Sequence, residues 1–267
     1  MKTQKITFVI ISLTLFLYSL NAEKPLPADK VEKGLAIAKL ADESDVGFDN
    51  FVVNIKMTLT NRHGKNSTRV MKTYTKEGIG DGDKAIIVFE TPRDIRGSAV
   101  LTYTHKLKSD DQWLYLPALG RVKRIASENK SGSFMGSEFA YEDLASQEVE
   151  KYDYAFLKEE KYNDADCYVV DRFPVDKNSG YTKITTWFNK KRLTVEKAVY
   201  YDRKDALLKT LVFSNYKQYL DKFWRAEKFD MTNHQKGKKT VLEWTNYKFK
   251  QKLKETMFTP NGMKRIR

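Results

Sequence analysis

Cysteine and histidine are scarce in this chain of 267 residues. It has one cysteine, Cys167, and three histidines, His63, His105 and His234. A single cysteine excludes an intramolecular disulfide and a cysteine-rich metal site. The histidines are not spaced as a metal-binding pair, so the sequence predicts no metal site. Cys167 begins the apolar run 167–170, which indicates a buried thiol rather than a reactive one.

Proline and glycine are also few. Six prolines and 13 glycines exclude collagen-like and linker-like chains. Disorder is excluded as well, because 41% of the residues are hydrophobic and 13% are aromatic, which is enough apolar surface to offset the entropy lost on folding. The sequence therefore describes a globular protein.

Catalytic motifs are missing too. The chain has no GxSxG elbow, no SxxK box and no phosphate-binding loop. The most notable acid pair is Glu142–Asp143, but adjacent helical residues point about 100° apart and cannot both face one bond. Helix capping, or pairing with Arg121, Lys123 or Arg124, is the favoured interpretation. The sequence thus predicts no catalytic residue, no cofactor and no enzyme, while lipid hydrolysis by Glu142 or Asp143 stays an open alternative.

What the chain has in excess is positive charge, a formal net charge of +13. Taken alone, this charge suggests nucleic acid or an anionic membrane surface as a partner. However, Lys2 and Lys5 precede an apolar run at 6–20, and Ala22 precedes a polar, proline-containing stretch. This pattern is typical of a secretory signal peptide. We expect residues 1–22 to be removed after Ala22, with an uncleaved anchor as the alternative.

Export changes how the charge is interpreted. An exported protein meets little nucleic acid, so we predict no nucleic-acid partner. The remaining basic residues are expected on the solvated faces of strands, or in transient contact with anionic phospholipid headgroups. No other apolar run is long enough to cross a bilayer, and no linker divides the chain. Residues 23–267 are therefore predicted to form one soluble domain outside the cytoplasm.

Hydrophobic periodicity predicts one helix followed by many strands. Val31, Leu35 and Ala38 have helical spacing, so a helix is expected over 28–42. Apolar residues then alternate with polar ones in short segments separated by turn residues. The strand candidates are 51–59, 68–76, 85–90, 98–104, 113–116, 152–156, 167–173, 182–188, 194–201, 207–213, 223–229 and 240–249. Their number and spacing are typical of an antiparallel sheet that curls into a barrel.

The alternation stops at 127–146. Residues 137–144 could form a short helix that Ser137 caps, and a break within a β meander suggests a segment that crosses the open side of the sheet. Its apolar residues are candidates for a lid: Phe134, Met135, Phe139 and Leu144. About a dozen strands enclose more space than side chains fill, so inward aromatic residues are expected to line a ligand cavity. The remaining candidates for this lining are Trp113, Tyr115, Trp187, Phe213 and Trp244.

One region resembles a known family. Arg96–Ser98 is followed by DQWLYLPALGRVKRI at 111–125 and by GSFMGSEFAYEDL at 132–144. In combination these stretches resemble the signature of the outer membrane lipoprotein-sorting proteins, relatives of the LolA and LolB carriers. The motif residues that carry the resemblance are Arg96, Gly97, Pro117, Arg124, Gly136, Tyr141, Glu142 and Asp143.

The resemblance implies an α+β fold that is mainly β: an incomplete, strongly curved antiparallel barrel of about 11 strands. An N-terminal helix and short helices would cover its apolar concave face. It also implies a periplasmic, non-catalytic carrier of lipid or lipoprotein acyl chains, with a transporter of the resistance-nodulation-division (RND) type as a possible partner. Two alternatives remain open: a structural or interaction module of the envelope, or an accessory protein of an RND-type lipid exporter that has no cargo of its own.

Overall fold

The computed structural model describes residues 26–266. The expected signal peptide, 1–22, lies outside the described residues. The helix predicted over 28–42 is present as α1 (Lys30–Asp45). The Asp29 carboxylate caps it by accepting hydrogen bonds from the backbone N–H groups of Val31 and Glu32, at 2.8 and 3.0 Å. Such a cap satisfies donors that have no partner within the helix.

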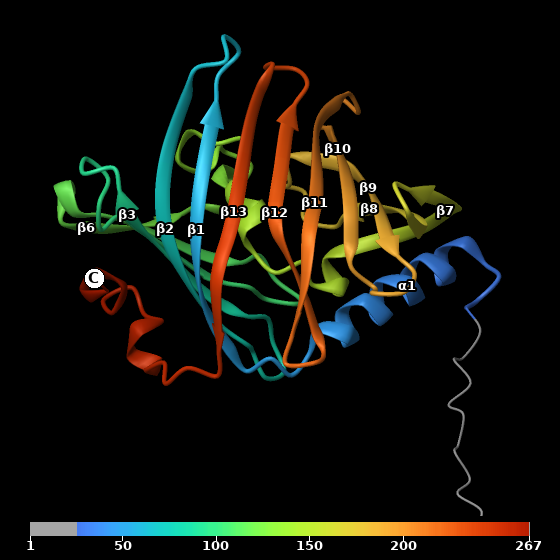
Figure 1. The fold of residues 1–267 in the computed structure, drawn as a ribbon, viewed down its shortest axis with the longest axis horizontal. Coiled ribbons are helices and arrows are strands. Elements are labelled where there is room, and N and C mark those ends of the chain that lie inside the picture. The colour runs from blue at the N-terminus through green and yellow to red at the C-terminus, as the bar shows by residue number, and fades with distance from the viewer. Residues whose placement is uncertain (1–25, 267) are drawn as a thin grey trace, which may run out of the picture.

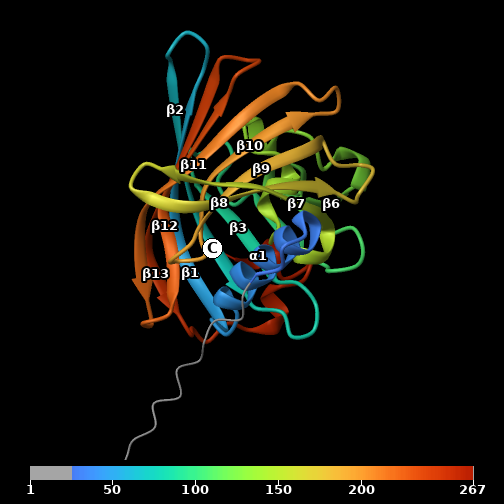
Figure 2. The ribbon, with the colours of Figure 1, turned by 90° about the vertical axis from the view of Figure 1, so that its right-hand side faces the viewer.

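The rest of the fold is one antiparallel sheet (Figures 1 and 2). Its strands are β1 (Asn50–Thr60), β2 (Asn66–Lys76), β3 (Lys84–Thr91), β4 (Ala99–Tyr103), β5 (Asp111–Leu116), β6 (Arg121–Ile125), β7 (Tyr152–Tyr162), β8 (Ala165–Pro174), β9 (Tyr181–Asn189), β10 (Val195–Asp202), β11 (Leu207–Tyr219), β12 (Phe223–Asn233) and β13 (Lys238–Phe249). The predicted curved, incomplete barrel is confirmed, with 13 strands in place of about 11. The strand that the sequence pattern missed is β6, which carries three basic residues in five positions.

The sheet does not close. Its strand order is β6-β5-β4-β3-β2-β1-β13-β12-β11-β10-β9-β8-β7, so β6 and β7 are the two edges. These edges are consecutive in the chain. The residues between them, 126–151, are called here the crossing segment. It contains the 3₁₀ helices η2 (Ser127–Asn129), η3 (Phe134–Gly136), η4 (Tyr141–Leu144) and η5 (Val149–Lys151).

The crossing segment differs from its prediction in one respect. Residues 137–144 do not form a single helix capped by Ser137, because Ser137 ends η3 and only Tyr141–Leu144 is helical. The break lies at Ala140, which is extended, with a φ of −85° and a ψ of 163°, and pairs with Ser133 in an isolated antiparallel β-bridge. A residue in this extended region cannot be part of a right-handed helix. Gly136, with a φ of 78°, is the last residue of η3 before this stretch.

The inner face of the sheet carries the main apolar core. On β1 the predicted alternation is confirmed, because Val53, Ile55 and Met57 are buried. The apolar core continues with Met231 of β12 and Phe134 of the crossing segment. Helix α1 packs on the same side against β7 (Figure 2), and the approach is close: a Cβ atom on Gly34 would lie 2.9 Å from the backbone nitrogen of Phe156.

The outer face has a second apolar cluster over β3, β4 and β5, called here the outer cluster. Ile86, Val88 and Leu101 point outward into it. The chain beyond β13 covers these residues with Phe258 and Met263, each 1% exposed. This C-terminal segment contains η6 (Glu255–Met257) and η7 (Met263–Arg265). The remaining short helix, η1 (Pro117–Leu119), turns the chain from β5 into β6.

Cys167 lies in β8 and is fully buried, as its apolar neighbours predicted. Burial raises the pKa of its thiol to about 11. A thiol with such a pKa holds its proton at neutral pH and is a poor nucleophile.

Candidate ligand cavity

A cavity of about 830 Å³ opens between the inner face of the sheet, α1 and the crossing segment. This volume lies within the range of ligand sites in proteins. Its apolar lining comes from elements far apart in the sequence. These residues are Ala38, Ala41, Phe48, Phe51, Ile87, Phe139, Leu144, Val149, Phe188, Phe229, Leu242 and Trp244.

Aromatic rings form one wall of this inner cavity. Phe229 contacts Trp244 with ring centroids 5.0 Å apart and contacts Phe213 at 4.7 Å. Trp244 in turn stacks on Tyr247. Aromatic rings bury a large apolar area and lose little conformational entropy when a ligand packs on them. The wall therefore offers a rigid apolar surface to a chain-like ligand.

Carboxylates border the same cavity. Burial raises the pKa values of Asp42, Asp45 and Asp83, and it raises that of Glu148 to about 7. Asp45 of α1 forms an ion pair with Arg225 of β12. The Arg225 guanidinium also lies over the ring of Phe48, 5.5 Å from its centroid.

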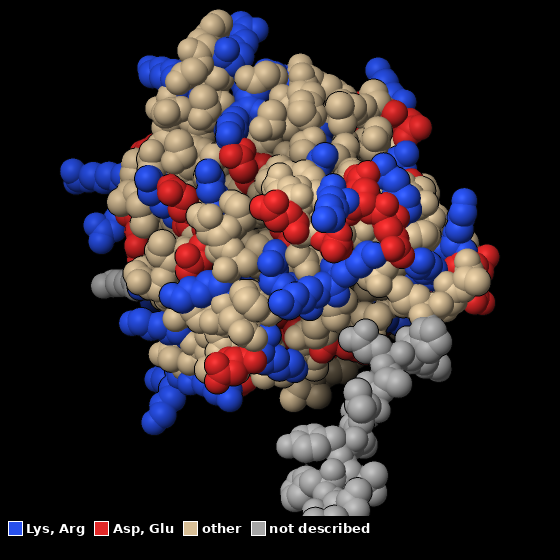
Figure 3. Space-filling view, turned by 45° about the vertical axis from the view of Figure 1, so that its right-hand side comes forward, with Lys and Arg blue, Asp and Glu red and all other residues tan. Residues whose placement is uncertain are grey.

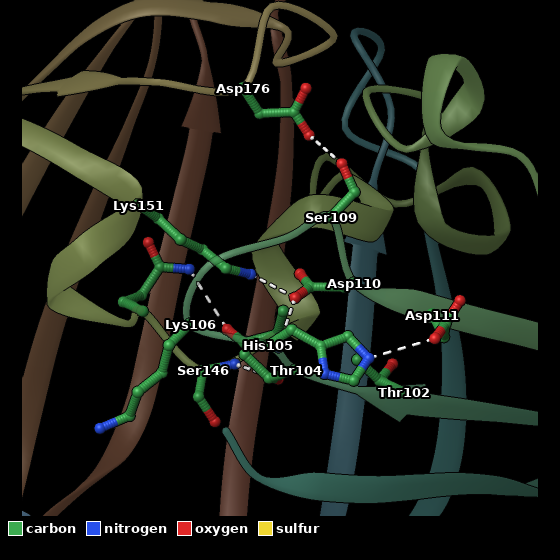
Figure 4. Close-up of polar contacts among 12 residues, drawn as sticks. Thr102, Thr104, His105, Lys106, Ser109, Asp110, Asp111, Ser146, Lys151 and Asp176 are labelled. Carbon is green, nitrogen blue, oxygen red and sulfur yellow. Dashed lines mark hydrogen bonds and ion pairs between the residues drawn. The ribbon is translucent and has the colours of Figure 1, made fainter. Parts of the chain in front are cut away.

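A second cavity of about 420 Å³ lies on the other side of the crossing segment. Residues 143 and 145–147 border both cavities and separate them. Hydrogen bonds hold this dividing wall in place: the backbone N–H of Ser146 donates to Thr104 Oγ1 at 3.2 Å, and Lys151 forms an ion pair with Asp110 (Figure 4).

The acid pair of the crossing segment is used for anchoring. Asp143 accepts hydrogen bonds from Lys209 Nζ at 2.6 Å and from the Tyr181 hydroxyl at 2.9 Å. Glu142 accepts from Ser179 Oγ at 2.8 Å and from the backbone N–H of Gly180 at 2.9 Å. Both acids thus tie the segment to β9, β11 and the loop before β9. The predicted capping role is confirmed for Asp143, which accepts a hydrogen bond at 2.7 Å from the backbone N–H of Ala140, the N-cap of η4. The alternative pairing with Arg121, Lys123 or Arg124 is wrong, since Lys209 is the ion-pair partner.

A family model whose description reads "Uncharacterized protein" matches residues 81–265. A crystal structure from Vibrio parahaemolyticus, assigned as an outer membrane lipoprotein-sorting protein domain, is 52% identical, with a TM-score of 0.86. That match covers 88% of this chain and 100% of the other. The chain belongs to the outer membrane lipoprotein-sorting protein family.

Other relatives extend this result. A DUF1329 family protein from Desulfovibrio piger is 32% identical over 88% of this chain and 99% of its own, with a TM-score of 0.84. A LolA superfamily protein from Nitrosomonas europaea matches 87% of this chain and 98% of its own at 24% identity, with a TM-score of 0.68. The latter shows that the fold is LolA-like. A search of curated proteins found no match.

The family motif has mainly structural contacts in this chain. Gly97 has a φ of 79° and packs closely on Pro117, the first residue of η1. Arg124 forms an ion pair with Asp111 across the β5–β6 hairpin. The carbonyl of Tyr141 accepts a hydrogen bond from Gln112 at 2.8 Å. The side chain of Arg96 is exposed.

Six of the nine expected cavity residues lie on the inner side. Phe139, Leu144 and Trp244 border the cavity. Phe134, Met135 and Phe213 pack in the inner core behind this lining. Phe134 is 1% exposed and contacts the ring of Phe89 at 5.7 Å, so it fixes the crossing segment to β3.

The other three lie elsewhere. Trp113 and Tyr115 pack in the outer cluster beneath the C-terminal segment. Trp187 donates a hydrogen bond from Nε1 to Glu160, and the Lys197 ammonium lies 4.5 Å from its ring centroid. The neighbour of Trp187, Phe188, borders the cavity instead. Adjacent residues of a strand point to opposite faces. The predicted cavity residue of β9 is therefore wrong by one position: Phe188 borders the cavity and Trp187 does not.

Sequence reasoning also missed lining residues on α1 and at the start of β1. Ala38 and Ala41 are three residues apart on α1 and share the face that borders the cavity. Their small side chains leave room beside the helix. The inward alternation that starts at Phe51 was the available signal for β1, and Phe51 borders the cavity. Nothing in the sequence pattern singled out Arg172 of β8, which also lies on the lining.

Two further features are absent from the part of the chain that the structure describes. Within residues 26–266, no group of three or more His, Cys, Asp or Glu side chains is placed to hold a metal ion. In the same part of the chain, no helix is both long and apolar enough to span a membrane. None of the three relatives described above is named as an enzyme.

Proposed function

We propose that this protein is a periplasmic carrier that binds acyl chains of a lipoprotein or lipid in its inner cavity and transfers them between envelope membranes. In this proposal it performs no covalent chemistry. The cavity of about 830 Å³ with its aromatic wall carries the proposal. Each buried methylene contributes about 0.8 kcal/mol, so a long chain supplies ample affinity. The similarity to lipoprotein-sorting relatives supports this class of cargo.

The proposed carrier is a single domain formed by residues 23–267 after removal of the signal peptide 1–22. One continuous sheet from β1 to β13 supports a single domain. The family resemblance implies an RND-type membrane transporter as the partner that supplies or accepts cargo. On the face shown in Figure 3, Lys and Arg side chains are mixed with Asp and Glu. A mixed surface favours a transient contact with anionic headgroups over firm adsorption.

The proposal is tested by filling the cavity. Ala41 borders it from α1, and Ala41→Trp would place an indole where the ligand chain is proposed to lie. Leu40, the preceding residue of the same helix, is 40% exposed, so Leu40→Trp is the matched control. Protein purified from its own host should carry lipid in native mass spectrometry, and Ala41→Trp should reduce lipid occupancy at least tenfold.

The control should retain wild-type occupancy, and thermal unfolding of all three proteins checks that they fold. A wild-type protein that is free of lipid under gentle conditions would contradict the carrier proposal. It would favour an interaction module of the envelope that has no cargo of its own.

A further inference from the structure

One charged residue of the cavity lining is deeply buried without an opposite charge. Arg172 of β8 is 7% exposed and borders the inner cavity. Its neighbours across the strands are Tyr154 of β7 and Ile184 of β9. Both belong to the apolar clusters of the inner face. The guanidinium therefore lies on the concave side of the sheet, between two groups of apolar side chains.

The guanidinium makes few polar contacts. Its Nε donates to Thr186 Oγ1 at 2.9 Å, and its central carbon lies 4.9 Å from the ring centroid of Tyr152. Within residues 26–266 it has no ion pair and no further hydrogen bond. Its two Nη atoms are not sealed by surrounding protein atoms, so the accessible part of this side chain faces the cavity.

Two other basic residues on this side of the sheet are paired. Lys209 forms an ion pair with Asp143 at 2.6 Å, and Arg225 forms one with Asp45. A buried charge without a partner is costly, because the protein interior replaces little of the hydration that the charge loses. An anionic group in the cavity would remove this cost. The guanidinium offers paired N–H donors that fit a carboxylate or a phosphate.

We propose that Arg172 binds the anionic group of an amphiphilic ligand, a carboxylate or a phosphate, whose acyl chain lies against the aromatic wall. This inference rests on the proposed carrier function and narrows it to anionic lipids. A neutral lipid would fill the same cavity but leave the guanidinium without a counter-charge.

The test compares ligands that differ only in charge. A fluorescent C18 fatty acid and its methyl ester are titrated into delipidated wild-type protein and into Arg172→Met. The control is Lys183→Met, which removes one positive charge from β9. Lys183 precedes Ile184 in this strand, so its side chain points to the opposite face, where it pairs with Asp171. Wild type should bind the acid at least tenfold more tightly than the ester.

In Arg172→Met this preference should fall to twofold or less, with affinity for the ester unchanged. In Lys183→Met the preference should remain. Equal binding of acid and ester by wild type, or a preference retained in Arg172→Met, would overturn the anion site and leave the carrier intact. Failure of wild type to bind either ligand would overturn the carrier itself.

A further arm separates a lipid anion from a free one. Inorganic phosphate at millimolar concentration should not displace the fatty acid, because the chain contributes most of the affinity. Displacement by phosphate alone would show that the site serves a free anion, and the lipid part of the inference would fail. Thermal unfolding confirms that Arg172→Met is folded, and the acid should stabilise wild type more than this variant.

Discussion

The two faces of β3 are equally apolar but differ in what covers them. Ile86 and Val88 point to the outer cluster, whereas Ile87 and Phe89 point inward. On the outer side, Phe258 and Met263 of the C-terminal segment pack onto this surface and are each 1% exposed. On the inner side, the crossing segment leaves a cavity of about 830 Å³. Apolar side chains therefore indicate burial, and the covering segment decides whether the buried space is core or binding site.

The largest effect is expected when the C-terminal segment and the crossing segment each lose one buried phenylalanine ring. Phe258→Ala should cost about 3–5 kcal/mol of unfolding free energy, because it opens a void in a filled cluster. Phe139→Ala should cost about 1–2 kcal/mol less, since the vacated space joins a cavity that already exists. Urea denaturation of both variants measures the difference. Equal losses would show that the inner side is as tightly filled as the outer one.

A smaller effect on stability is expected from the polar residues that anchor the crossing segment. Burial raises the pKa of Glu142 to about 7, and the adjacent Asp143 carboxylate adds to the shift. The folded protein therefore keeps this proton at pH values where the unfolded chain has released it. Stability should fall as the pH rises from about 4.5 to about 7, by about 3 kcal/mol at most from this residue.

Glu142→Gln should flatten that decline in urea denaturation measured across the same pH range. Glu128→Gln changes an exposed residue of the same segment and should keep the wild-type slope. If Glu142→Gln also keeps the wild-type slope, the raised pKa of Glu142 is not the cause of the decline in stability.

The smallest expected effect compares two tryptophans. Trp244 borders the cavity, whereas Trp113 lies in the outer cluster. Trp244→Phe should weaken binding of the fluorescent fatty acid by about fivefold, which corresponds to about 1 kcal/mol of lost contact. Trp113→Phe should leave the affinity unchanged. A loss of affinity only in Trp113→Phe would place the ligand on the outer side.

Much of the fold could be predicted from hydrophobic periodicity and from turn residues. Asp29 and the helical spacing after it predicted α1, and alternation at Val53, Ile55 and Met57 predicted the inner face of β1. The β6 strand was missed because it is an edge strand: Arg121, Lys123 and Arg124 are exposed, and a strand paired on one side tolerates charge. Its apolar signal is correspondingly weak.

The site was less predictable for two physical reasons. Alternation of apolar and polar residues separates the two faces of a strand but does not show which face is the inner one. On β5 both faces are partly buried. The C-terminal segment shows no hydrophobic periodicity, so the sequence did not predict that it would cover Trp113. Arg172 was missed because a basic residue in a strand usually faces solvent, and only the three-dimensional fold shows it at the cavity.

The place of the crossing segment in the topology also ties the two edges of the sheet together. Because β6 and β7 are the two edges of the sheet and consecutive strands of the chain, one continuous peptide bridges the gap between them. An extended chain spans at most about 3.3–3.6 Å per residue. Four 3₁₀ helices and the anchors of Glu142 and Asp143 hold this bridge far short of that reach. The contacts of residues 126–151, rather than their length, therefore tie the two edges together.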